Sequence, residues 1–285
     1  MQKRKICLNT VTDGTDKSIS EIIRLYAALG IDGFFTPWEK GKISEWARTA
    51  NDTGMFYQSV HAPFGEIAEL WHGERNKAEA VLSELTECLE ECSENGVPMM
   101  ISHVYIGDFN TVGVPSGEGL ERFSRLIRRA DTLGVSIALE NTEGEEYLDA
   151  LFRNFGGERS VGFCIDSGHE QCYNRGKDLL ALYGDKLIAT HINDNLGVCD
   201  PAGLITWRDD LHLMPYDGII DWSAFAGRLK KCGYSGPLTF EMKRKSVGGR
   251  HENDAYAAMP YEEYIAECFS RAKKFAEEQK IAVHH

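Results

Sequence analysis

The sequence lacks the segments that would place it in a membrane or in a disordered class. No apolar run approaches the ~18 residues that a membrane-spanning helix needs, and residues 1–7 are basic without the apolar stretch of a signal peptide. No low-complexity tract or obvious linker interrupts the 285 residues, and the 42% hydrophobic content is too high for a disordered chain. We therefore expect a cytoplasmic globular protein without a membrane segment.

Closely spaced cysteine pairs are also missing. The eight cysteines are scattered, and none has the C-x-x-C spacing of a metal or redox motif. Cys88 and Cys92 lie four residues apart on an expected helix, so we interpret them as small apolar core residues. All eight are predicted to be reduced thiols.

The sequence has fewer basic than acidic residues. The chain has 31 Lys and Arg against 44 Asp and Glu, which gives a formal net charge of −13. Because nucleic-acid binding depends on neutralising phosphates with basic side chains, this balance disfavours a nucleic acid as partner.

What is present is a recurring junction between helical and strand-like segments. A helical pattern ends in Gly, which adopts the left-handed conformation past many helices, and a short apolar run follows. The junction recurs at Gly30, Gly54, Gly96, Gly134, Gly156–Gly157, Gly184 and Gly233.

Eight strands are predicted between these junctions. They are short and almost continuously apolar, as in parallel sheets that are buried on both faces. They span 5–10, 33–37, 56–62, 98–104, 135–140, 161–166, 187–193 and 238–243.

The segments between the strands have helical periodicity, most clearly over 120–133 and 261–275. Eight strands in strict alternation with helices favour an α/β fold, a single (β/α)8 TIM barrel formed by one domain of residues 1–285. A dinucleotide-binding fold is disfavoured, because the first strand is not followed by a G-x-G-x-x-G turn.

Carboxylates and imidazoles stand at or just beyond the ends of six predicted strands, where TIM barrels build their active sites. Five of the nine histidines belong to this set. The residues are His61, His103, Glu140, Asp166, His169, His191, Asp210, His212 and Glu241.

Four of these residues come from four consecutive strands and are predicted to hold a metal. They are Glu140, Asp166, His191 and Glu241. Three carboxylates buried together repel one another, and a divalent cation removes that cost. A lone histidine such as His61 or His103 is alternatively a hydrogen-bonded core residue.

Six motifs along the chain carry a resemblance to a known family. The sequence resembles the xylose isomerase-like TIM-barrel superfamily, which includes sugar phosphate isomerases and epimerases and endonuclease IV. The motifs are HAPF at 61–64, LENT at 139–142, D-x-x-H at 166–169, H-x-N-D at 191–194, D-x-H-x-x-P at 210–215 and G-x-I-D-W at 218–222.

Within the isomerase and epimerase branch, the resemblance implies one metal on Glu140, Asp166, His191 and Glu241. Both glutamates would also move the proton, and His169 would bind a substrate oxygen. Glu146 matches a substrate-contacting glutamate of ketose 3-epimerases. Gly197 departs from that group, because its members often place an arginine there.

The endonuclease IV branch implies a different metal count. Its three-zinc cluster uses nine ligands, and every one has a candidate among the nine residues named above. The acidic loop after Asp194 departs from the endonuclease pattern. A multinuclear Zn²⁺ hydrolase or phosphodiesterase therefore stays as an alternative, as does a dehydratase or lyase on the same metal site.

The favoured function is a divalent-metal-dependent isomerase or epimerase that acts on a small sugar or polyol-derived carbonyl compound. Glu140 and Glu241 would transfer the proton through a metal-stabilised enediolate. A single-metal site rich in carboxylates favours Mn²⁺, Mg²⁺ or Co²⁺. The order in which the glutamates act is left open, and so is the number of subunits, with a homo-oligomer among the alternatives.

Two further groups are predicted to contact the substrate. Lys243, Lys245 and Arg250 make the loop after the last strand basic, which suggests an anionic carbohydrate or, alternatively, a solvated loop. Trp38, Trp71 and Trp207 follow predicted strands and either pack on a sugar ring or belong to ordinary packing.

Overall fold

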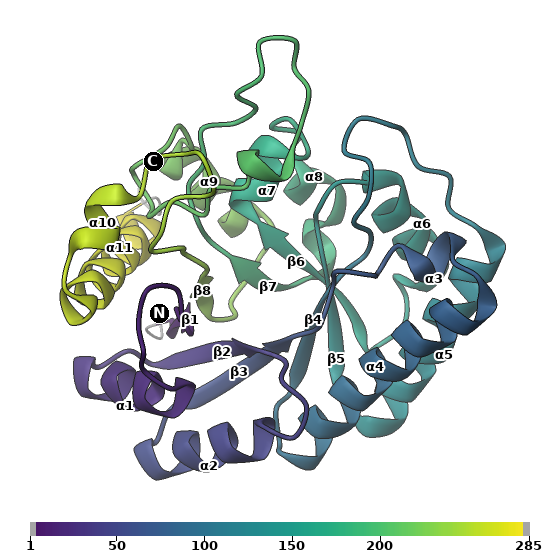
Figure 1. The fold of residues 1–285 in the computed structure, drawn as a ribbon, viewed down its shortest axis with the longest axis horizontal. Coiled ribbons are helices and arrows are strands. Elements are labelled where there is room, and N and C mark those ends of the chain that lie inside the picture. Colours follow the sequence, from purple (N-terminus) through teal and green to yellow (C-terminus); the bar gives the residue numbers. More distant parts are fainter. Residues whose placement is uncertain (1–3, 282–285) are drawn as a thin grey trace.

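Eight parallel strands form the centre of the molecule (Figure 1). The structure is a computed structural model that describes residues 4–281. The strands agree with the eight predicted from the sequence within a few residues at their ends. They are β1 (Ile6–Asn9), β2 (Gly33–Pro37), β3 (Phe56–His61), β4 (Met99–His103), β5 (Ser136–Glu140), β6 (Val161–Asp166), β7 (Leu187–His191) and β8 (Leu238–Phe240).

The strands close into a barrel in the order β7-β6-β5-β4-β3-β2-β1-β8. Between β7 and β8 the pairing consists of a single parallel bridge, Ile192 to Phe240. There the Ile192 N–H donates to the Thr239 carbonyl at 2.8 Å, and the Glu241 N–H donates to the Ile192 carbonyl at 3.1 Å. The predicted TIM barrel is thus confirmed, with its weakest pairing between β7 and β8.

Helices alternate with the strands and cover the outside of the barrel (Figure 1). Two short 3-10 turns, η1 (Gly184–Lys186) and η2 (Trp207–Asp209), lie between them. The helices are α1 (Ile19–Leu29), α2 (Ile43–Thr53), α3 (Glu69–His72), α4 (Arg75–Glu94), α5 (Gly117–Leu133), α6 (Glu145–Phe155), α7 (Ser167–Cys172), α8 (Leu179–Tyr183), α9 (Trp222–Lys231), α10 (Asp254–Ala258) and α11 (Tyr261–Ile281).

Five of the predicted glycine stops have the expected left-handed backbone. These are Gly30, Gly54, Gly96, Gly134 and Gly233, with φ between 69° and 78°. The prediction is wrong for two others, because φ is −66° at Gly156 and −65° at Gly184. At Gly184 the reason for a glycine is steric, because a Cβ atom there would lie only 2.2 Å from the Cys232 sulfur.

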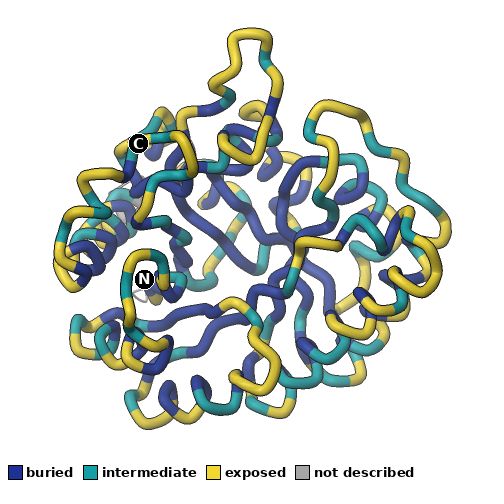
Figure 2. The backbone as a smooth tube through the Cα atoms, viewed as in Figure 1, coloured by how far each residue is buried: buried dark blue, intermediate teal, exposed yellow. Residues whose placement is uncertain are grey.

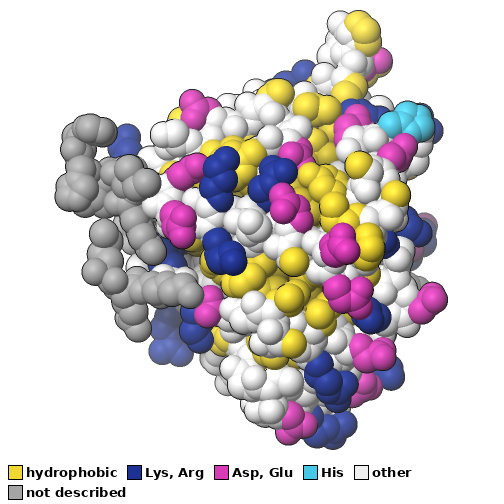
Figure 3. Space-filling model, turned by 90° about the vertical axis from the view of Figure 1, so that its left-hand side faces the viewer, with side chains coloured by type: hydrophobic (Ala, Val, Ile, Leu, Met, Phe, Trp, Pro, Cys, Tyr) yellow, Lys and Arg dark blue, Asp and Glu magenta, His cyan; other side chains and the backbone are white. Residues whose placement is uncertain are grey.

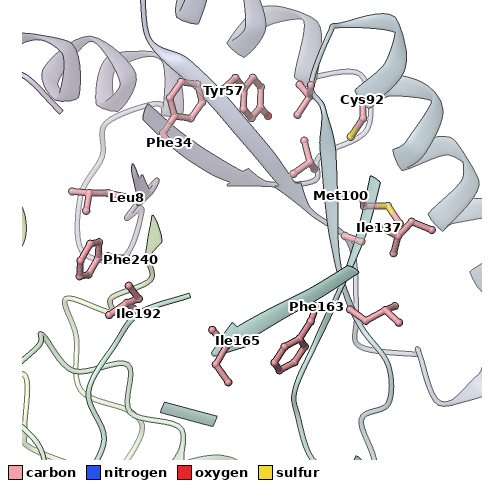
Figure 4. Close-up of a cluster of buried hydrophobic side chains, with 14 of the residues drawn as sticks. Leu8, Phe34, Tyr57, Cys92, Met100, Ile137, Phe163, Ile165, Ile192 and Phe240 are labelled. Carbon is pink, nitrogen blue, oxygen red and sulfur yellow. The ribbon is translucent and has the colours of Figure 1, made fainter. Parts of the chain in front are cut away.

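The main core lies between the barrel and its helices (Figures 2 and 4). Strand residues such as Ile137, Phe163 and Ile165 point outward into it. Inside the barrel a separate cluster of small side chains packs together, and it consists of Ile101, Ala138, Cys164 and Ala189. This inner layer is the surface on which the site described below is built.

The cysteines behave as expected from the sequence, and Trp222 belongs to the core. All eight cysteines are free, and Cys88 and Cys92 are fully buried among the helices. Trp222 is 5% exposed and packs against Phe225 and Phe275.

The surface carries both signs of charge. On the face that bears α10 and α11, acidic, basic and apolar side chains are interspersed (Figure 3). Among residues 4–281, no helix is long and apolar enough to cross a bilayer.

Candidate metal centre and cavity

The site lies one layer above the small inner core of the barrel. Side chains alternate between the two faces of a strand, so the residue two positions after each inner core residue also points inward. Ala138 is followed in this way by Glu140, and Cys164 by Asp166. The same step leads from Ala189 to His191 and from Ile101 to His103. Strand periodicity therefore places acidic and imidazole groups together at the carboxyl end of the barrel.

Glu140 is the centre of this layer and is fully buried. One carboxylate oxygen, Oε2, lies 3.2 Å from His61 Nε2 and 3.4 Å from His103 Nε2. The other, Oε1, lies 2.9 Å from His191 Nδ1. Glu140, Asp166, His191 and Glu241 each bring a ligand atom within 4.8 Å of the others, and so form one group able to hold a metal ion.

A second group lies beside the first. His212 Nδ1 is 2.7 Å from Asp210 Oδ1, and His169 Nε2 is 3.3 Å from the same oxygen. Asp210 and His212 alternate with Leu211 and Leu213, which are buried on the other side of this segment. The structure thus brings all nine predicted residues together in one place.

His212 has a left-handed backbone conformation, with φ of 47°, which residues other than glycine rarely adopt. Its carbonyl accepts a hydrogen bond from the Lys243 N–H at 3.0 Å. This bond ties the loop after β7 to the loop after β8 at the point where the imidazole enters the site.

Backbone carbonyls orient two of the imidazoles. His61 Nδ1 lies 2.9 Å from the Ala62 carbonyl oxygen, and His169 Nδ1 lies 2.9 Å from the Asn141 carbonyl oxygen. A carbonyl only accepts, so each Nδ1 carries the hydrogen and donates it. When these rings are neutral, Nε2 carries no hydrogen and its lone pair faces the carboxylates of the site. This is the tautomer in which a histidine can bind a metal through Nε2.

Neighbouring amides and rings fix the remaining ligands. Asp166 accepts from the His169 N–H at 2.7 Å and from Asn193 Nδ2 at 2.8 Å. The ring of Phe35 stacks on His191 with 4.6 Å between centroids. These contacts hold the side chains in place before any ligand binds.

Several site atoms are buried without a hydrogen-bond partner. They include His191 Nε2, Asp210 Oδ1, His212 Nδ1 and Glu241 Oε2. Glu241 Oε2 lies 2.8 Å from His191 Nδ1, yet the pair lacks hydrogen-bond geometry. These nitrogen and oxygen atoms lie close together without forming hydrogen bonds to one another, and a shared cation would supply the missing partner. The residues therefore fit a divalent metal.

The pKa values reflect the crowding of these groups. Burial lowers the pKa of His103 to about 4, against the opposing charge of Glu140. Burial would also lower the pKa of His212, but the carboxylates of Asp210 and Glu241 together outweigh this effect, and the pKa rises to about 9. Burial raises the pKa of the Asp166 carboxyl. At neutral pH the His212 ring is therefore protonated and the His103 ring is neutral in the metal-free site.

A cavity of about 660 Å³ opens above these groups. Its floor includes His61, His103, His169, His212 and Glu241. Glu140, Asp166 and His191 do not line it, because they lie beneath the floor. The walls come from the loops after β1, β3, β4, β5, β7 and β8 and from α7.

The comparisons with known proteins agree with the barrel fold. Residues 23–280 match the sequence profile of the xylose isomerase-like TIM barrel family. The chain belongs to this family. The resemblance noted in the sequence motifs is thereby confirmed over most of the chain.

Two sequence relatives differ in how much is known of them. An uncharacterized protein, y4fM of Sinorhizobium fredii, is 35% identical over 194 residues, which are 62% of this chain and 58% of that relative. The inosose isomerase of Bacillus velezensis is 24% identical over 259 residues, which are 84% of this chain and 89% of the isomerase.

Two solved structures of this fold are also similar to the chain. A zinc-bound IolI protein superposes with a TM-score of 0.72 and 18% identity, covering 99% of this chain and 100% of IolI. The 3-keto-D-glucoside 4-epimerase YcjR of E. coli has a TM-score of 0.67 and 18% identity, covering 94% of this chain and 100% of YcjR. At these identities the solved structures establish the shared barrel.

The predicted tryptophans of this xylose isomerase-like barrel lie in different environments. Trp207 lines the cavity and is 55% exposed. Trp71 is fully buried, with its Nε1 donating to the Val104 carbonyl at 2.7 Å, and it packs beside Tyr147 and Phe123. Trp38 packs against the main core and does not line the cavity. Of the three, only Trp207 is placed to contact a substrate.

Of the polar residues predicted to contact the substrate, some line the cavity and others do not. Glu146 accepts a hydrogen bond from the Gly113 N–H, outside the cavity lining. Lys243 lines the cavity and pairs with Asp210 at 3.1 Å. Lys245 lines the cavity without an ion pair among the described residues, whereas Arg250 lies outside the lining and pairs with Glu252 at 2.5 Å.

Sequence reasoning missed Glu143, which lies three residues after Glu140. Its side chain lines the cavity, and the residue is only 3% exposed. One oxygen accepts the Gly107 N–H at 2.9 Å, and burial raises the pKa of the carboxyl to about 7. Its only signal in the sequence is its place directly after the LENT motif.

Proposed function

We propose that this protein is a divalent-metal-dependent isomerase or epimerase acting on a small sugar or polyol-derived carbonyl compound. The observation that carries the proposal is the convergence of Glu140 and Glu241 on one imidazole nitrogen, His191 Nδ1, at 2.9 and 2.8 Å. The similarity to an inosose isomerase and to a 3-keto-D-glucoside 4-epimerase supports this choice of reaction.

Glu140, Asp166, His191 and Glu241 would hold the metal. When bound, a divalent ion polarises a carbonyl group and so acidifies the neighbouring C–H bond. The mixture of three carboxylates and one imidazole suits Mn²⁺, Mg²⁺ or Co²⁺ and also accommodates Zn²⁺.

Glu241 is the glutamate that we assign to proton removal. It lines the cavity, and its side chain is 18% exposed, whereas that of Glu140 is fully buried. Glu241 Oε2 faces His191, which leaves Oε1 for a substrate C–H group. We assign Glu140, which lies beneath the cavity floor, to holding the metal, and His169 to binding a substrate oxygen from the floor.

The polar wall of the cavity would bind the hydroxyl groups of the substrate. Thr10 contributes a buried Oγ1 that has no partner. Lys243 and Lys245 enter from the loop after β8. An anionic group on the substrate would be bound by Lys245, because the charge of Lys243 is already balanced by Asp210.

Exchange of a substrate C–H with solvent deuterium tests the reaction type. The protein is loaded with Mn²⁺ and incubated in D₂O with D-fructose, D-allulose or an inosose, and deuterium incorporation is followed by NMR. We expect exchange in at least one of them, lost in Glu241→Gln and kept in the exposed control Glu263→Gln. Full exchange in Glu241→Gln would contradict the assignment.

Two further sets of residues that could each hold a metal ion support an alternative function. Asp166, His169 and His212 form a further set able to hold an ion, as do His61, Glu140 and His191. A multinuclear zinc hydrolase or phosphodiesterase would fill all three sets. Metal analysis of the purified protein separates the two functions, since one ion per chain supports the isomerase and two or three zinc ions support the hydrolase. A dehydratase or lyase on the same site would release water or a cleaved product.

A further inference from the structure

Most of the exposed large apolar side chains among the described residues lie on loops at the carboxyl end of the barrel. Eight large hydrophobic residues are exposed among those described, and all except Leu182 lie on the loops after β3, β4 and β7. These seven are Phe64, Val112, Val114, Leu196, Leu204, Trp207 and Ile219. Two of them, Phe64 and Trp207, line the cavity, and exposed apolar side chains at a cavity are typical of a binding surface.

Aromatic rings continue from the rim of the cavity down to the metal-ligand groups. The ring centroids of Phe109 and Tyr173 are 5.3 Å apart, and those of Tyr173 and His169 are 5.0 Å apart. On the loop after β3, Phe64 stacks on His103 at 4.6 Å. Together with Ile106 and Trp207 these residues line the cavity, and we call Phe64, Ile106, Phe109, Tyr173 and Trp207 the aromatic wall.

Hydrogen bonds hold part of this wall in place. Asn110 Nδ2 donates to the Ile205 carbonyl, and the Ile205 N–H donates to Asn110 Oδ1, both at 2.9 Å. Phe109 precedes Asn110, and Trp207 follows Ile205 by two residues. The loops after β4 and β7 are therefore joined beside the two aromatic side chains that they supply.

Both lysines and most of the small hydroxyl side chains of the cavity come from a different part of the barrel. Thr10 and Thr12 follow β1, and Lys243, Lys245 and Ser246 follow β8. In the strand order, β1 and β8 are neighbours and lie across the barrel from β4. The two lysines of the cavity therefore lie on the side of β8, and the rings of Phe64 and Phe109 lie on the opposite side, where Thr142 and Glu143 also line the cavity. Trp207 stands beside the loop after β8, since a Cβ atom at Gly248 would lie 3.6 Å from its ring.

The cavity is also larger than one sugar requires. Its volume of about 660 Å³ is typical of sites that enclose drug-sized ligands, roughly 300–1,000 Å³. A monosaccharide bound at the carboxylate floor would leave the outer part of the aromatic wall uncovered. Aromatic rings are well suited to planar apolar groups, which they stack against.

We propose that the aromatic wall is a subsite for a planar apolar substituent carried by the sugar, so that the substrate is an aryl glycoside or a similar conjugate. The sugar half of this statement rests on the proposed function. The aromatic half rests on the wall itself. Phe109 and Trp207 would stack on the substituent near the rim, while the sugar ring lies over Glu241.

Calorimetric titration with matched ligands tests the subsite. Phenyl and methyl β-D-glucopyranoside share a sugar and differ in the planar group, and phenol carries the planar group alone. We expect phenyl glucoside to bind at least tenfold more tightly than methyl glucoside. The preference should disappear in Phe109→Ala/Trp207→Ala and persist in Leu182→Ala, which removes the exposed apolar side chain away from the mouth.

Unfolding curves and the variant Phe109→Leu/Trp207→Phe distinguish a lost subsite from a damaged fold, because the second pair keeps apolar bulk and should keep part of the preference. Equal binding of both glucosides, or a preference that survives in the double alanine variant, would overturn the proposal. Binding of none of the three ligands would overturn it as well.

The test also separates this proposal from the proposed function. Binding of phenol that depends on Phe109 and Trp207, without binding of either glucoside, would support the aromatic subsite and count against a sugar substrate. The competing occupant of the rim is a second copy of this chain. A wild-type dimer that becomes monomeric in the double alanine variant, with no preference for phenyl glucoside, would overturn the subsite.

Discussion

Asp194 accepts a hydrogen bond from the indole Nε1 of Trp222 at 3.0 Å, across the loop that carries Asp210 and His212. The same buried carboxylate accepts the N–H groups of Tyr216 at 2.9 Å and Ile220 at 3.2 Å. The H-x-N-D motif therefore does three things within four residues. His191 enters the metal centre, Asn193 holds Asp166, and Asp194 organises the loop that completes the site.

Replacing this carboxylate should destabilise the protein. In Asp194→Asn an amide NH₂ would face N–H donors, which leaves buried groups unpaired at about 1–3 kcal/mol each. We expect the free energy of unfolding to fall by about 2–4 kcal/mol in urea titrations. The control is Asp200→Asn at the exposed turn of the same loop, where asparagine makes the same turn hydrogen bonds. A stability equal to wild type in Asp194→Asn would contradict this account.

Metal affinity should increase with pH. The pKa of His212 is about 9, because the carboxylates of Asp210 and Glu241 together outweigh the effect of burial. The protonated ring lies 3.5 Å from Glu241 Oε2 and 3.9 Å from Asp166 Oδ2, so its charge opposes a cation bound by these oxygens. Affinity for Mn²⁺ should rise between pH 6 and 9, by at most about tenfold per pH unit for one proton.

Titrations in buffers of different ionisation enthalpy measure the protons released. We expect His212→Gln to flatten the pH dependence, and the exposed control His251→Gln to leave it unchanged. Equal affinities at pH 6 and pH 9 in the wild-type protein would argue against a protonated His212 in the metal-free site.

Glu143 should make stability fall as pH rises. Its pKa in the folded state is about 7 because of burial, above the ~4.3 of an unfolded glutamate. A raised carboxyl pKa contributes stability below about pH 4.3, and this contribution is lost as pH rises toward 7. Relative to Glu143→Gln, the wild-type protein should lose about 3 kcal/mol over this range.

Unfolding experiments with a metal chelator present check this prediction, because a bound cation would change the charge near Glu143. The exposed residue Glu39 supplies the matched control, Glu39→Gln. Parallel pH profiles for wild type and Glu143→Gln would show that the carboxyl titrates normally in the folded state.

The contact between Asn110 and Ile205 should limit the motion of two loops. Asn110→Ala removes both hydrogen bonds, so residues 105–114 and 197–206 should exchange their amide hydrogens severalfold faster. Hydrogen exchange followed by mass spectrometry measures this directly. Asn154→Ala on the outer face of α6 should leave both loops unchanged. Unaltered exchange in Asn110→Ala would mean that other contacts hold the loops together.

The barrel strands and the convergence of the candidate metal ligands could be predicted from the sequence because both depend on local rules. Buried parallel strands are short and apolar, and the fold gathers their carboxyl ends at one face. The residues at strand ends, such as Glu140 and His191, could therefore be assigned to one site before any distance was known.

The cavity walls could not be predicted in this way. Whether a loop residue such as Trp207 or Phe64 reaches the cavity depends on how the loop folds, and the periodicity of the strands says nothing about loops. Trp71 shows the same limit, since it follows a strand but lies among helices. Glu143 was missed because its environment depends on the distant Gly107.

The single bridge between β7 and β8 lies directly between two of the proposed metal ligands. His191 precedes Ile192 and Glu241 follows Phe240, so the two ligands flank the least-paired seam of the barrel. An ion held by both side chains would tie the two sheet edges together there. Closure of the barrel would then depend on whether the ion is bound, and removal of the ion should loosen the pairing of β7 with β8 before that of any other strands.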